Sequence, residues 1–199
     1  VWFFGNEYPF YAWMNKLGLP TEGGPDGVTV LKQSFDVQPL IQKQADCISV
    51  MTYNEYWQVI DAGITEDELV TFKYEDQGVA TLEDGLWVLE QNLADEAFVD
   101  RMARFVRASM KGWKYTEENP DEAAEIVLEN DETGAQQEHH QQRMAREIAK
   151  LTAGSNGALD PADYERTVET LLTGGDEPVI AEKPEGAWTH AVTDKAFGG

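Results

Sequence analysis

The sequence predicts an α/β protein, with one α/β lobe followed by a helical segment that returns to another lobe. Two observations support this fold class. Short apolar runs alternate with amphipathic stretches up to about residue 80, a pattern typical of parallel strands covered by helices. Beyond that point the apolar residues recur mainly at helical spacing. We therefore expect an α/β lobe over residues 1–80 and a crossover strand with helices over residues 81–199.

The elements of this α/β lobe follow from these runs. The strands are expected at residues 1–4, 28–32, 47–51 and 69–74. The helices are expected at residues 10–17, 37–44 and 55–62. Gly18 and Gly63 directly follow two of these helices, which is where glycine commonly ends a helix. This order predicts a mainly parallel sheet.

The second part begins with one more expected strand, residues 86–89, and continues as helices. The helices are expected at residues 95–118, 121–129, 136–151 and 161–172, the last with Asp160 as its N-cap. Residues 176–199, rich in Gly, Pro and charge, are expected to be irregular. The chain does not begin with Met and opens inside a predicted strand. We therefore expect upstream sequence to supply the rest of the lobe to which residues 81–199 return.

Composition and charge limit the function. With 15 basic and 37 acidic residues the net charge is -22, which argues against nucleic acid or an anionic membrane as a partner. One cysteine, Cys47, excludes an internal disulfide and a cysteine-based zinc site, and its apolar surroundings predict a buried thiol. His139 and His140 point about 100° apart on a helix, so we expect solvent exposure and no metal site. No run approaches the roughly 20 apolar residues of a membrane helix.

Two turns that join a predicted strand to a helix hold the candidate ligand-binding residues. They are Asn6, Glu7 and Tyr8 in the first turn, and Tyr53, Asn54, Glu55 and Trp57 in the second. Ligands of open α/β sheets bind beyond the carboxyl ends of strands, where helix N-termini present free N–H groups. Other roles stay open: the two carboxylates can stabilise the helix dipoles, Trp57 can be a core residue, and the asparagines can cap their turns.

Asp76, Gln77 and Gly78 lie where the chain leaves the α/β lobe of residues 1–80. A short polar segment ending in glycine at such a position favours a hinge over ligand contact.

These segments resemble the NMT1/THI5-like branch of the periplasmic substrate-binding proteins of ABC importers. The resemblance rests on residues 1–10, on residues 42–47 leading into 52–55, and on residues 78–90. It implies a type II periplasmic-binding-protein-like fold, in which two α/β lobes close on a ligand. Residues 1–80 would then be lobe two, and residues 81–199 would return to lobe one, the rest of which lies upstream. It also implies an ABC permease as partner, only peripheral contact with the membrane, and a periplasmic location after removal of a signal peptide that this chain does not show.

The resemblance implies a small heteroaromatic ligand, such as a thiamine-precursor aminopyrimidine. Glu55, with Glu7, would accept hydrogen bonds from its amino group between aromatic walls. A flavin, a sulfonate or another small anion remains an alternative, although neither turn contains Arg. A pyrimidine synthase of the THI5 type is a further alternative. That chemistry is tied to a cysteine-rich iron motif, which Cys47 alone does not match, so we expect neither catalysis nor a cofactor.

The helix at residues 95–118 also bears on oligomeric state. Phe98, Phe105 and Trp113 lie on its apolar face, which would be exposed without the upstream sequence. A homodimer could cover this face.

Overall fold

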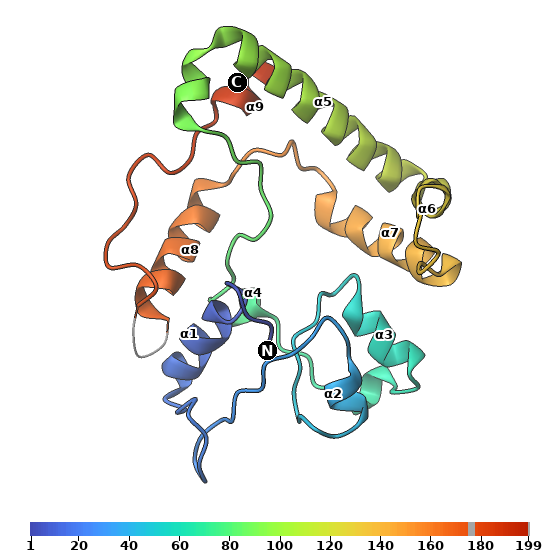
Figure 1. The fold of residues 1–199 in the computed structure, drawn as a ribbon, viewed down its shortest axis with the longest axis vertical. Coiled ribbons are helices and arrows are strands. Elements are labelled where there is room, and N and C mark those ends of the chain that lie inside the picture. The colour runs from blue at the N-terminus through green and yellow to red at the C-terminus, as the bar shows by residue number, and fades with distance from the viewer. Residues whose placement is uncertain (175–177, 199) are drawn as a thin grey trace. The chain divides into compact units, whose positions relative to one another are not determined.

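The computed structural model describes residues 1–174 and 178–198, and nearly all of its regular structure is helical (Figure 1). The helices before residue 90 are short: α1 (Tyr8–Leu17), α2 (Gln38–Ile41), α3 (Glu55–Asp61), α4 (Tyr74–Gln77) and the 3-10 turn η1 (Glu66–Glu68). The later ones are η2 (Glu90–Ala94), α5 (Glu96–Glu118), α6 (Pro120–Glu129), α7 (Glu138–Thr152), α8 (Pro161–Thr173) and α9 (Ala191–Phe197).

The chain divides into two compact units. The first unit comprises Val1–Met51, Gln58–Asp84 and Asp160–Ala187. The second unit comprises Thr52–Trp57, Gly85–Leu159 and Trp188–Gly199. Each unit therefore combines segments that are far apart in the sequence.

The prediction of an α/β, type II periplasmic-binding-protein-like fold is wrong. Over residues 1–174 and 178–198 the structure contains no β-sheet, and its strand-type pairing is one isolated antiparallel bridge between Glu22 and Thr29. The segments predicted as strands are instead turns or irregular backbone without a ladder, and Tyr74 begins a helix. The apolar runs therefore do not pair as strands.

A buried glutamine explains part of this difference. Residue 1 does lie beside residues 31–33: the Val1 amino group donates to the Leu31 carbonyl at 2.9 Å, and the Gln33 N–H donates to the Val1 carbonyl at 2.9 Å. The Gln33 side chain then binds both backbone groups of Ser49, each at 2.8 Å. Because a side-chain amide satisfies the groups that a third strand would use, the segments pack together without extending a ladder.

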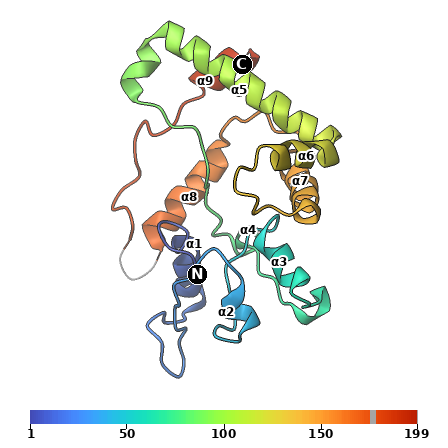
Figure 2. The same ribbon diagram turned by 45° about the vertical axis from the view of Figure 1, so that its right-hand side comes forward.

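In the first unit, α1 packs against α8 (Figures 1 and 2). Phe10, Ala12 and Met14 of α1 are buried, as is Val168 of α8. The Lys16 ammonium donates to the Gln77 carbonyl at 2.7 Å and so links α1 to α4. This unit is held by helix packing rather than by a sheet.

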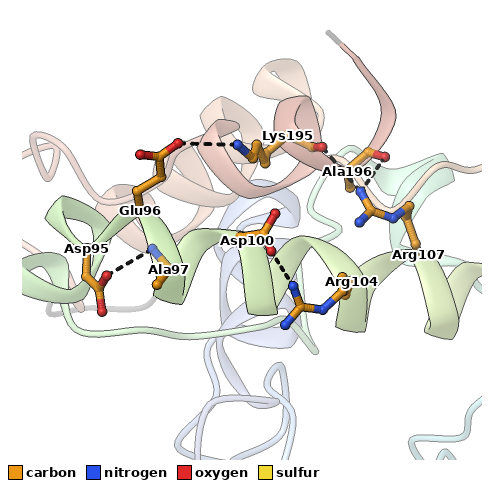
Figure 3. A network of polar contacts seen from close by, with 8 residues as sticks. All are labelled: Asp95, Glu96, Ala97, Asp100, Arg104, Arg107, Lys195 and Ala196. Atoms are coloured by element: carbon orange, nitrogen blue, oxygen red, sulfur yellow. Dashed lines mark hydrogen bonds and ion pairs between the residues drawn. The ribbon is translucent and has the colours of Figure 1, made fainter.

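In the second unit, α5 contacts α6, α7 and α9. Ala103 and Val106 of α5 form a small core with Ala196 of α9. The Arg107 guanidinium donates to the carbonyls of Lys195 and Ala196 at 3.3 and 3.0 Å, which fastens α9 along α5 (Figure 3). Helix α9 corrects the prediction that the tail is irregular; residues 176–177 and 199 of that prediction lie outside the described residues.

The helices predicted beyond residue 90 are confirmed within one or two residues at each end. Asp95 and Asp160 cap α5 and α8 by accepting from the N–H groups of Ala97 and Ala162, at 2.9 and 2.7 Å. The predicted burial of Cys47 is wrong, because its side chain is exposed.

Candidate functional site

The first predicted turn, in the first unit, leads into α1. Phe4 and Gly5 adopt positive φ angles of 66° and 114°, which reverse the chain before the helix. The Gly5 N–H donates to Glu7 Oε2 at 2.7 Å, and Glu7 is buried. Asn6 and Tyr8 flank it and are half-buried. The carboxylate thus stabilises its own turn by a hydrogen bond, a structural role different from the helix-dipole role considered for it from the sequence.

The second predicted turn, in the second unit, leads into α3. The Asn54 carbonyl accepts from the Trp57 N–H at 3.0 Å, so Asn54 directly precedes the first helical turn. The Asn54 side-chain Nδ2 donates to Glu55 Oε1 at 2.9 Å. Glu55 is only 5% exposed, which is unusual for a carboxylate. Tyr53 is half-buried beside them.

Two side chains of helix α7, an imidazole and a guanidinium, contact this second turn. His140 Nε2 lies 2.8 Å from Asn54 Oδ1. The Arg143 guanidinium lies 4.8 Å from the centroid of the Trp57 ring, a cation–π distance. The result is a compact group of an amide, a buried carboxylate, an indole, an imidazole and a guanidinium, which we call the α3–α7 cluster: Asn54, Glu55, Trp57, His140 and Arg143.

The Trp57 indole N–H is a buried hydrogen-bond donor. Its Nε1 is buried and, within the described part of the chain, has no hydrogen-bond partner. Its ring meets that of Tyr56 edge to face, with centroids 5.2 Å apart. A buried N–H without a partner carries a desolvation cost that a bound acceptor would relieve.

No local pattern in the sequence indicates that the α7 residues His140 and Arg143 belong to this cluster. His140 was expected to be exposed with His139, but only His139 is exposed; His140 is half-buried against Asn54. Arg143 lies on the same helix and reaches the Trp57 ring. Both lie more than 80 positions from their partners, a separation over which no local pattern in the sequence signals contact.

The structure brings Asn54, Glu55 and Trp57 together, whereas Asn6, Glu7 and Tyr8 belong to the other unit. A joint site formed by both turns remains a prediction.

The predicted hinge residues lie at the end of α4. Asp76 and Gln77 close this helix, and Gly78 follows it with φ +69°, a left-handed conformation that favours glycine. The bond from Lys16 to the Gln77 carbonyl ties this point to α1. A hinge role here stays a prediction.

A cavity of about 300 Å³ opens in the first unit, away from the predicted residues. It is lined by Tyr11, Asn15, Gly18, Leu19, Pro20, Thr21 and Glu22. Its lining contains none of the residues predicted from the two turns and no Lys, Arg or His side chain, so its volume alone does not make it a better site than the α3–α7 cluster.

No cluster of three or more His, Cys, Asp or Glu side chains in residues 1–174 and 178–198 could hold a metal ion. Among the same residues, no helix is both long and apolar enough to span a membrane.

Comparison with known proteins gives one match. The family model described as NMT1/THI5 like matches residues 12–123, more than half of the chain. The match includes the second turn and the predicted hinge, and it confirms the resemblance drawn from the sequence. No curated protein and no solved structure matches the chain.

Proposed function

Since the chain belongs to the NMT1/THI5-like family, we propose that it is a solute-binding protein that captures a small heteroaromatic compound and passes it to an ABC permease. A thiamine-precursor aminopyrimidine is the proposed ligand. The proposal includes a periplasmic location, a division of the chain near residue 80, and movement about Asp76, Gln77 and Gly78 when the ligand binds.

The α3–α7 cluster supports this proposal. Its buried Glu55 carboxylate can accept from an exocyclic amino group, while the Trp57 indole supplies a flat aromatic surface and a buried N–H. An aminopyrimidine offers the matching features, because it has N–H donors, ring-nitrogen acceptors and a planar face.

The first experiment is native mass spectrometry of the purified full-length protein, followed by denaturation to identify any released small molecule. Titration calorimetry with 4-amino-5-hydroxymethyl-2-methylpyrimidine then measures affinity. We expect Glu55→Gln to weaken binding about tenfold or more, since it removes a charge-assisted hydrogen bond. Tyr53→Ala should weaken binding as well.

Glu129→Gln is the matched control, because Glu129 is an exposed carboxylate at the end of α6 in the same unit. It should leave the affinity unchanged. Equal affinities for the native protein, Glu55→Gln and Tyr53→Ala would contradict the site.

A small anion, such as a sulfonate, is the second candidate ligand, and Arg143 is the observation that favours it. The turns contain no Arg, but α7 supplies one to the Trp57 ring. Thermal-shift measurements with alkanesulfonates, flavin mononucleotide and aminopyrimidines would separate the candidates. Stabilisation by a sulfonate or flavin that Arg143→Gln abolishes would replace the aminopyrimidine proposal.

A THI5-type synthase remains the enzymatic alternative within this family. Iron-dependent formation of a pyrimidine by the full-length protein would establish it and overturn the proposal of a purely binding role.

A further inference from the structure

We infer that His140 is a positioning residue for the ligand site: it holds the Asn54 amide, and through that amide it orients the Glu55 carboxylate. This inference rests on the proposed function and deepens it. All of the residues concerned belong to the second unit.

The direction of each hydrogen bond follows from Glu55. Rotating the Asn54 amide by 180° would exchange its oxygen and nitrogen with little change in shape. An ionised carboxylate only accepts hydrogen bonds, so the atom that faces Glu55 Oε1 at 2.9 Å must be the Nδ2 donor. The Asn54 oxygen therefore faces His140.

The Asn54 oxygen also determines which ring nitrogen of His140 carries a proton. Because an amide oxygen only accepts hydrogen bonds, His140 Nε2, 2.8 Å from Asn54 Oδ1, must be the donor, whether the ring is neutral or charged. The chain of donors thus runs from His140 to Asn54 to Glu55. A fixed amide keeps Oε1 in place, which lowers the entropy lost when a ligand binds to the carboxylate.

The arrangement has a consequence for specificity. Glu55 is buried, and its ionised carboxylate can only accept hydrogen bonds. It already accepts one from the uncharged Asn54 amide. Bringing an anionic group against it would be repulsive, whereas an N–H group would be attracted. Within this site, the Asn54–Glu55 pair selects for ligands that present N–H donors.

The test uses substitutions that keep or remove the donor at Nε2. His140→Gln places an amide nitrogen close to the position of Nε2, whereas His140→Ala and His140→Asn do not. His139→Gln is the control, because His139 is the exposed neighbour on the same helix. Two readouts are needed: the order parameter of the Asn54 side-chain amide by NMR, and the affinity for 4-amino-5-hydroxymethyl-2-methylpyrimidine.

We expect the Asn54 amide to be rigid in the native protein and in His140→Gln, and mobile in His140→Ala and His140→Asn, with an order parameter below about 0.6. We expect the latter two variants to lose about tenfold in affinity. His139→Gln should match the native protein in both readouts.

An unchanged Asn54 amide in His140→Ala, or an equal loss of order in His139→Gln, would overturn the inference. If the native protein does not bind the probe, the proposed ligand is wrong, but the amide measurement still decides whether His140 positions Asn54. Failure of the inference and failure of the proposed function are therefore distinguishable.

Discussion

The fold changes the ionisation of Tyr74. Burial raises the pKa of its hydroxyl to about 12, while a hydrogen bond to Ser49 acts in the opposite direction. Its ring lies 6.5 Å from that of Trp13, which in turn packs against Phe72 at 5.1 Å. The aromatic groups around this phenol thus favour its neutral form.

Tyr74 should make stability depend on pH above the neutral range. The pKa is about 12 in the folded protein against 10.0 for the ordinary phenol, so the folded state retains the proton longer. The contribution is complete below pH 10 and is lost as the pH rises to 12, by about 2 to 3 kcal/mol in total. Urea unfolding at several pH values from 8 upward should show a steeper decline for the native protein than for Tyr74→Phe. Parallel declines would contradict this assignment.

At the scale of elements, α9 is held against α5 by apolar packing and by Arg107. Ala103, Val106 and Ala196 form the buried part, with Met110 and Val192 packed against it, and Arg107 supplies two hydrogen bonds to carbonyls at the end of α9. Lys195 adds an ion pair with Glu96 at 3.7 Å, but both side chains are exposed, so this pair contributes little (Figure 3). The bonds from Arg107 also compensate the negative end of the helix dipole.

Replacing Arg107 should therefore loosen α9 without unfolding α5. We expect Arg107→Ala to raise the hydrogen-exchange rate of the amides in Ala191–Phe197 about tenfold, which corresponds to the loss of one to two hydrogen bonds. Arg104→Ala is the control: it removes the same charge from the same helix, but its ion pair is with Asp100 within α5. Equal exchange in the two variants would indicate a general charge effect instead of a specific contact.

For the whole molecule, charge is the dominant property. The net charge of -22 produces repulsion in the compact state that the unfolded chain relieves by expanding. Raising the salt concentration from 0.01 M to 1 M shortens the screening length from about 30 Å to about 3 Å.

Stability should accordingly rise with salt. We expect the urea midpoint to increase between 50 and 500 mM NaCl, by an amount that KCl reproduces at the same ionic strength. A midpoint that falls or stays constant would show that specific ion pairs, such as Arg146 with Asp121 at 2.5 Å, outweigh the net repulsion.

Exposed apolar side chains are the other property at this scale. Phe105 and Trp113 of α5 are 52% and 41% exposed, and Phe98 is half-buried. Trp87, in the segment predicted as a crossover strand, is 84% exposed. A homodimer that covers the α5 face stays a prediction.

The sequence by itself determined the long helices, the N-cap Asp160, the acidity and the family. Helical periodicity and an N-cap such as Asp160 depend on residues within a few positions of one another, so local patterns are sufficient to predict them. The choice of Asn54, Glu55 and Trp57 as candidates likewise came from one short turn, and their ligand-binding role is still to be tested.

Only the tertiary structure decided how the apolar runs pack and what surrounds the second turn. A sheet requires backbone hydrogen bonds between distant segments. Here the Gln33 side chain forms hydrogen bonds with both the N–H and the carbonyl of Ser49, which a neighbouring strand would otherwise bind. In the same way, His140 and Arg143 reach Asn54 and Trp57 only because α7 folds back onto the start of α3. The physical reason is common to both cases: contacts between distant residues depend on the whole packing, which a local pattern of polarity does not encode.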